Sequence, residues 1–204
     1  MPVTREQFES GMTYEAYKAQ MTRNREQLER NEQNLELSED DLAAFKRLPR
    51  PIRVLALAED WCGDVIANLP ILGRLARESG KLDVRVHLRD QEPGTRIMDE
   101  HLNQGQFRSI PLFVFLDDDF REIGVWIERP ASVTERRAQE TRELYARHPE
   151  WGSPDAPVAE LPEELRVQVQ QAIQKMRQDM APFANREVVR ELRDLVTQAA
   201  AQVA

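Results

Sequence analysis

The chain has 204 residues, of which 41% are hydrophobic and 31% are charged, and its formal net charge is -8 at pH 7. This acidic balance disfavours a nucleic-acid site built from Lys and Arg. The first residues lack the apolar core of a signal peptide, and no run approaches the roughly 18 apolar residues of a membrane span, so we expect a cytoplasmic protein that binds neither nucleic acid nor membranes. The single cysteine excludes an internal disulfide and fits a reducing compartment.

The N-terminal segment is polar and free of proline from residue 4 to residue 36, and its apolar side chains recur every three or four residues. This spacing predicts one or two amphipathic helices. Ser38 and Asp41 then form a capping-box-like start and basic residues precede Pro49, which predicts a helix from about 39 to 47. The periodic apolar residues are Phe8, Met12, Tyr14, Tyr17, Met21 and Leu28.

Strands and helices alternate in the middle of the chain. The apolar run 52–58 is typical of a strand buried on both faces, and helical spacing follows over 63–78, where Pro70 predicts a kink rather than an end. Further strands are expected at 82–88, 112–116 and 121–127, and further helices at 94–103 and 131–148. This order predicts an α/β fold with one mixed sheet flanked by helices.

The C-terminal part of the chain is first rich in proline and then helical. Residues 149–164 carry four of the twelve prolines and are typical of a linker or a surface strap. Two apolar stripes separated by Pro182 then predict a helical hairpin, with Asn185 capping its second arm. The stripes either pack against the main domain or bind a partner or a second copy. The predicted domains are an N-terminal helical extension at 1–37, a core domain at 38–148, and a linker with a helical hairpin at 149–204.

The single cysteine, Cys62, lies after the 52–58 strand and directly before the next helix. Backbone N–H groups and the helix dipole favour an anion there, so we expect a lowered thiol pKa and an exposed sulfur. Asp64 opposes this, because at about 7 Å its charge raises the energy of a thiolate by about 2 kcal/mol, similar to the helix-end benefit. Asp64 therefore either caps the helix or tunes the thiol.

Two motifs resemble the thioredoxin superfamily. "DWCGDV" occupies the place of the Trp-Cys-x-x-Cys motif after the central strand, and "SIPLFVFLD" places Ile110 and Pro111 where the superfamily has its cis-proline loop against the active-site sulfur. "GVWIERP" is similar to a bacterial branch that often carries Trp-Cys-Gly-Asp. The resemblance covers about 38–147 and implies a thioredoxin-like fold. The site residues that it implies are Cys62 as nucleophile with Asp64, and Trp61, Gly63, Ile110 and Pro111 around the substrate.

The chain departs from the superfamily at Val65, where the motif has its resolving cysteine. A thiolate at Cys62 forms a mixed disulfide, but the chain has no second thiolate to release it. The resemblance therefore implies monothiol thiol-disulfide exchange or low-molecular-weight thiol transfer, with a thiol- or disulfide-containing protein or a small thiol as partner. The alternative is a redox-inactive thioredoxin-fold module that binds or scaffolds a partner. The oligomeric state stays open.

Other polar groups near the motif have two interpretations. Trp61 forms a partly exposed wall of the sulfur site or packs in the core, and Glu59 and Asp60 either end a strand in solvent or carry a proton for Cys62. An iron–sulfur cluster of the monothiol-glutaredoxin kind is disfavoured, because "LDDDFREIGVWIERP" lacks the expected Gly-Gly pair. No glycine-rich phosphate loop is present, and the histidines lack metal-ligand spacing, so we expect neither metal nor cofactor. The three histidines are His87, His101 and His148.

Overall fold

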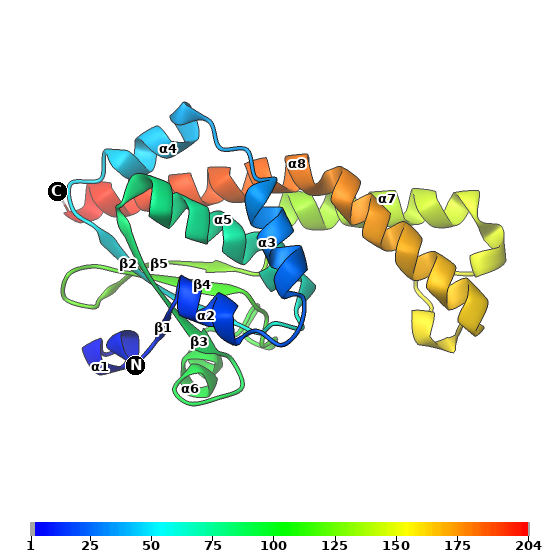
Figure 1. Ribbon diagram of the computed structural model, residues 1–204, viewed down its shortest axis with the longest axis horizontal. Helices are drawn as coiled ribbons and strands as arrows, with labels where there is room; N and C mark the ends of the chain where they lie inside the picture. Colours follow the sequence, from blue (N-terminus) through cyan, green and yellow to red (C-terminus); the bar gives the residue numbers. More distant parts are fainter. Residues whose placement is uncertain (1–2, 204) are drawn as a thin grey trace. The chain divides into compact units, whose positions relative to one another are not determined.

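The computed structural model describes residues 3–203, and the chain forms two compact units (Figure 1). The first unit comprises Met1–Arg129 together with Val188–Ala204 and contains the sheet, whereas the second, Pro130–Glu187, is helical. The site residues predicted from the sequence all belong to the first unit.

A five-stranded mixed sheet organises the first unit, with the strand order β1-β3-β2-β4-β5. β2 runs parallel to β3, with Ile52 opposite Leu82, and antiparallel to β4, with Leu57 opposite Leu112. β5 pairs antiparallel with β4 and forms one edge. The strands are β1 (Met12–Thr13), β2 (Ile52–Ala58), β3 (Leu82–Leu88), β4 (Leu112–Leu116) and β5 (Glu122–Ile127). The predicted α/β fold, a mixed sheet with helical flanks and extensions, is confirmed.

The burial of the strands follows their sequence patterns. Every residue of β4 is buried, and β2 is buried at every position except Arg53, because both strands lie inside the sheet. Across the β4–β5 pair, the rings of Phe113 and Trp126 stack with 5.1 Å between their centroids. Removing apolar surface from water contributes about 25 cal/mol per Å², so these continuous apolar runs anchor the sheet to which the site is attached.

One helix begins just after the central strand, and the site lies at its start. α5 (Gly63–Ser79) follows β2 and continues through Pro70, as predicted. Gly80 caps its C-terminus with a φ of 64°, the left-handed conformation that glycine adopts at helix C-termini. The start of α5 therefore lies at the carboxyl end of the most buried part of the sheet.

Two shorter helices also begin where the sequence predicts. α4 (Glu39–Lys46) begins after Ser38, and Ser38 and Asp41 form the reciprocal hydrogen bonds of a capping box. α6 (Gly94–Glu100) lies on the other face of the sheet from α5 (Figure 1). A cis peptide bond between Glu92 and Pro93 precedes α6, and the sequence analysis does not predict it.

The N-terminal segment differs from the predicted one or two helices, because it forms three short helices and strand β1. Thr13 starts a new helix by accepting a hydrogen bond from the backbone N–H of Ala16. Gly11 allows the chain to approach β3, since a Cβ there would lie 2.8 Å from the Cβ of Arg85. Asn24, with a φ of 54°, separates the last two helices. The helices are α1 (Arg5–Glu9), α2 (Tyr14–Gln20) and α3 (Arg25–Gln33).

The predicted helical hairpin at the C-terminus is wrong. Both apolar stripes belong to one helix, α8 (Glu163–Val203), and Asn185 lies inside it rather than capping a second arm. Pro182 removes one backbone donor, but no glycine or turn-forming run follows it, so the neighbouring helix formers continue the helix. In the first unit, α8 follows the first of the two alternatives and packs against the main core, where Val188 and Leu192 are buried.

The second unit contains α7 (Ala131–Arg147), two short 3-10 helices and the first part of α8. The 3-10 helices are η1 (Pro149–Trp151) and η2 (Val158–Glu160), and they lie in the segment predicted as a linker or strap. Trp151 is buried, with its ring 5.6 Å from that of Tyr145, so this segment is anchored by a small apolar cluster. The domain boundaries after residues 37 and 148 stay a prediction.

Candidate functional site

Cys62 lies between β2 and α5 and faces the second sequence motif. It is the N-cap of α5, with φ of -87° and ψ of 118°, and its carbonyl oxygen accepts the N–H of Ile66 at 3.0 Å. Its thiol donates to the carbonyl oxygen of Ile110, with 3.5 Å between Sγ and oxygen. The fold therefore brings together two motifs that the sequence analysis links only through a resemblance.

The pKa of the Cys62 thiol is raised above its ordinary value. Burial is the largest cause, and the negative charges of Asp64 and Glu128 act in the same direction. The backbone N–H groups of Val65 and Asp64 stabilise a thiolate, but their effect is smaller than that of burial. The expectation of a lowered pKa is therefore wrong, because the half-buried thiol loses more from desolvation than it gains from the helix start. The expectation of an exposed sulfur holds only in part, since Cys62 is partly buried.

The proline loop is attached to the end of β5 and to α5. The peptide bond between Ile110 and Pro111 is cis. The Pro111 carbonyl oxygen accepts the N–H of Glu128 at 2.7 Å, and Nδ2 of Asn68 donates to the Glu128 carbonyl at 2.8 Å. Glu128 has a φ of 64°, which is uncommon for a residue other than glycine. These bonds fix the segment after β5 beside the loop that contacts the sulfur.

Asp64 is paired with Arg129, which the sequence analysis does not identify as a site residue. The guanidinium of Arg129 binds the Asp64 carboxylate and lies 2.7 Å from the carboxylate of Glu128. It therefore partly neutralises both acids whose charges raise the pKa of Cys62. Asp64 and Arg129 are 65 residues apart, so no local pattern joins them, and the only available signal was the "GVWIERP" motif.

Trp61 is 45% exposed, which agrees with its interpretation as a wall of the site. The guanidinium of Arg89 lies 4.9 Å from the centroid of its ring. Arg89 is held there by two hydrogen bonds of 2.8 Å to the carboxylate of Asp90 and by one of 3.2 Å to the Arg108 carbonyl. Gly63, directly after the cysteine, is the first residue of α5.

Both acids that follow β2 accept hydrogen bonds from other segments. Asp60 accepts the backbone N–H groups of Thr22 at 2.8 Å and Arg23 at 3.0 Å. Partial burial raises the pKa of Asp60, but these bonds outweigh it and the net shift is downward. Glu59 accepts the N–H of Asp90 at 3.1 Å. Asp60 therefore stays charged and connects the α2–α3 segment to the cysteine turn.

Tyr17 of α2 lies close to this turn, and the sequence analysis does not identify it as a site residue. Its side chain is 0% exposed, and its hydroxyl has no hydrogen-bond partner within residues 3–203. Burial raises its pKa, and the charges of Asp60, Glu59 and Cys62 raise it further. In the sequence, Tyr17 is one position of an apolar stripe, which gives no sign of its hydroxyl.

Residues 3–203 contain no group of three His, Cys, Asp or Glu side chains placed to hold a metal ion. The histidines have other contacts: His87 is 2.7 Å from the Gln7 carbonyl, and His101 is 2.8 Å from the Glu122 carboxylate. In the same part of the chain, no helix combines the length and apolar character needed to cross a membrane.

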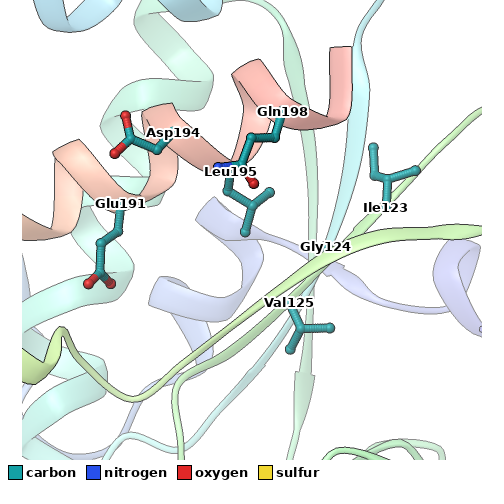
Figure 2. A pocket seen from close by; sticks show the side chains of 7 residues that line it. All are labelled: Ile123, Gly124, Val125, Glu191, Asp194, Leu195 and Gln198. Atoms are coloured by element: carbon teal, nitrogen blue, oxygen red, sulfur yellow. The ribbon is translucent and has the colours of Figure 1, made fainter. Parts of the chain in front are cut away.

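A cavity of about 310 Å³ lies between the edge strand β5 and α8 (Figure 2). Leu195 approaches the strand closely at Gly124, where a Cβ would lie 2.9 Å from its side chain. Glu191 accepts a hydrogen bond of 2.7 Å from the indole N–H of Trp126. Cys62 does not line this cavity. The lining residues are Ile123, Gly124, Val125, Glu191, Asp194, Leu195 and Gln198.

A family model described as Thioredoxin matches residues 11–142, well over half of the chain. The chain belongs to the thioredoxin family. The match begins at residue 11 and therefore also covers strand β1, which pairs with β3.

Two solved structures are similar to this thioredoxin-family protein over most of its length. A crystal structure of an HIV epitope scaffold has a TM-score of 0.58 and 17% identity, covering 98% of this chain and 97% of the scaffold. A crystal structure of a protein of unknown function from Pseudomonas aeruginosa has a TM-score of 0.58 and 20% identity, covering 88% of this chain and 99% of that one. At these identities the likeness shows the fold alone. No curated protein matches the chain.

Proposed function

We propose that this protein performs monothiol thiol-disulfide exchange through Cys62. The observation that carries the proposal is the position of the thiol, at the start of α5 and 3.5 Å from the Ile110 carbonyl beside cis-Pro111. Trp61 offers a half-exposed aromatic surface next to it. The proposed partner is a disulfide, either in a protein or in the oxidised form of a low-molecular-weight thiol. We further assign the chain to the branch of the family that carries Trp-Cys-Gly-Asp.

The proposed exchange begins when Cys62 loses its proton to solvent. The thiolate attacks one sulfur of the disulfide, and the bond from Cys62 to that sulfur forms as the original S–S bond breaks. The second sulfur leaves as a thiolate and takes a proton from solvent. Cys62 is thereby oxidised to a mixed disulfide, and the leaving sulfur is reduced to a thiol.

Release of the mixed disulfide requires a thiol from outside the chain, because the sequence contains one cysteine. Val65, in the first turn of α5, is fully buried and has no nucleophile. We propose that a low-molecular-weight thiol attacks the sulfur bonded to Cys62. If the adduct on Cys62 is a small thiol, the new disulfide joins the two small molecules. If the adduct is a protein substrate, the new disulfide joins the small thiol to that protein. In both cases Cys62 leaves as a thiolate that takes up a proton.

Adduct formation tests the proposal. The protein is incubated with an oxidised low-molecular-weight thiol, and its mass is followed over time between about pH 7 and about pH 9. We expect one adduct on the wild type and none on Cys62→Ser. Because the pKa of Cys62 is raised, the thiolate fraction and the rate increase with pH by up to about tenfold per unit. A folded wild type that forms no adduct even at the highest pH would contradict the proposal.

A second function is the binding of a partner without thiol-disulfide exchange. The raised pKa of Cys62, of which burial is the largest cause, favours this function. In this case Trp61 and Phe107, 45% and 56% exposed, are the large apolar side chains available for contact near the two motifs. The rate of Cys62 alkylation by iodoacetamide separates the two functions. After correction for the thiolate fraction, a rate close to that of a free thiol supports exchange, and a rate far below it supports a binding module.

A further inference from the structure

We propose that the Glu128 side chain is a positioning residue for Cys62, and that it holds the proline loop, residues 109–111, in a fixed place against the start of α5. The inference rests on the proposed function and deepens it, because only an exchange reaction needs a fixed geometry between the sulfur and this loop. Glu128 directly follows β5, and its side chain is 26% exposed. It acts on the sulfur through other residues.

The backbone conformation at Glu128 would suit glycine better than glutamate. Its φ is 64°, in the left-handed region that residues with a side chain rarely adopt. A glycine there would keep both backbone hydrogen bonds of this position, from its N–H to the Pro111 carbonyl and from Asn68 to its own carbonyl. The turn itself therefore needs no side chain, and the strained glutamate indicates a use for its carboxylate.

One oxygen of the Glu128 carboxylate connects to the start of α5. Its Oε1 lies 2.7 Å from the guanidinium of Arg129, and the same guanidinium binds the carboxylate of Asp64. Asp64 is the second residue of α5, two positions after Cys62. The three charged side chains are between 18 and 26% exposed, so water and salt screen their attraction less than they would at the surface.

The other oxygen of the carboxylate connects to the proline loop. Nδ2 of Asn103 donates to Oε2 of Glu128 at 3.2 Å and to the hydroxyl of Ser109, also at 3.2 Å. Ser109 directly precedes Ile110, whose carbonyl oxygen accepts the hydrogen bond of the thiol. The backbone N–H of Glu128 binds the same loop at the Pro111 carbonyl. The loop is therefore held on both sides of the carbonyl that contacts the sulfur.

These contacts join the two segments between which the sulfur lies. Exchange requires the attacking, attacked and leaving sulfur atoms to line up, so a disulfide that approaches Cys62 along the loop is aligned only if the loop keeps its place relative to α5. Alkylation makes no such demand, because a reagent as small as iodoacetamide reaches the sulfur without lying on the loop. The two reactions therefore report separately on the position of the loop and on the state of the thiol.

Glu128→Gly is the decisive variant, because it removes both side-chain connections and keeps both backbone hydrogen bonds. The rates of mixed-disulfide formation with oxidised glutathione and of alkylation by iodoacetamide are measured on this variant and on the wild type. Loss of the Glu128 charge should lower the pKa of Cys62, so both rates are divided by the thiolate fraction obtained from the pH profile of alkylation. We expect the corrected exchange rate to fall about tenfold and the corrected alkylation rate to stay unchanged.

Gln104→Gly is the matched control, since Gln104 is exposed and also has a left-handed φ, of 54°. Both of its corrected rates should equal those of the wild type. Asn103→Ala tests the connection itself, because it removes the link between Glu128 and Ser109. Alone it should slow corrected exchange about threefold, and in the Glu128→Gly background it should add nothing, since both changes break the same connection.

An unchanged corrected exchange rate in Glu128→Gly overturns the inference. An equal fall in exchange and alkylation also overturns it, because the thiol itself would then have become less accessible. Independent effects of Glu128→Gly and Asn103→Ala overturn the connection through Asn103. Absence of any mixed disulfide on the wild type contradicts the proposed function and this inference with it, whereas its presence together with unchanged exchange in Glu128→Gly contradicts the role of Glu128 alone.

Discussion

Two buried polar regions of the first unit, one around Glu32 and one around Cys62, differ in how completely their groups are paired. Glu32 of α3 accepts hydrogen bonds from Tyr14 at 3.1 Å, Lys18 at 3.0 Å and Arg77 at 2.7 Å. Burial raises the pKa of Glu32, but these bonds outweigh it and lower the pKa. This region therefore holds α2, α3 and α5 together through groups that are all satisfied.

The region around Cys62 has fewer contacts for its polar groups. The thiol makes one long hydrogen bond of 3.5 Å to Ile110, and the Tyr17 hydroxyl has none within residues 3–203. The two acids that raise the thiol pKa share Arg129 as a counter-ion. The polar groups of the cysteine region are therefore less completely paired than those around Glu32.

The largest effect on stability is expected from Glu32→Ala. Its loss leaves the side chain of Lys18, which is 12% exposed, without its buried partner, so we expect the free energy of unfolding to fall by about 3 kcal/mol. Urea unfolding measures this change. Glu39→Ala is the control, because Glu39 is 89% exposed and its pair with Lys46 should contribute less than about 1 kcal/mol. Equal losses in the two variants would contradict the distinction between the regions.

A smaller effect, on reactivity rather than stability, is expected from Arg129→Gln. Removing the counter-ion of Asp64 and Glu128 should raise the pKa of Cys62 by about one unit and slow its alkylation near neutral pH about tenfold. Adding Asp64→Asn should restore much of the rate. Arg136→Gln is the control, since Arg136 pairs with Glu140 in the second unit. A rate that does not change in Arg129→Gln would show that these acids do not govern the thiol.

Most of the first unit could be predicted from sequence because its elements carry local signals. The apolar run of β2, the capping residues Ser38 and Asp41, and the continuation of α5 through Pro70 all agree with the structure. Strand β1 has two residues and depends on a close approach at Gly11, so it has no periodicity to detect. The continuous α8 was missed because a proline inside a helix and a proline between helices give the same pattern.

The site was predicted only as far as its two motifs extend. The contact between Cys62 and the Ile110 carbonyl agrees with the order of the motifs, and the exposure of Trp61 agrees with its expected place. Arg129 and Tyr17 belong to segments that are distant from Cys62 in the sequence. Their positions along the chain do not indicate that they lie near the site. The direction of the Cys62 pKa shift does not follow from the sequence, because a helix start is a local feature, whereas burial depends on the whole fold.

The most direct test of the central claim is disulfide-reductase turnover with a regenerating dithiol, compared between the wild type, Val65→Cys and Cys62→Ser. The single thiol of the wild type should form a mixed disulfide but sustain little turnover, because no second thiolate in the chain releases the substrate. Val65→Cys places a second sulfur in the first turn of α5 and should gain turnover, whereas Cys62→Ser should form no adduct. Sustained turnover by the wild type at the rate of Val65→Cys would contradict the monothiol account.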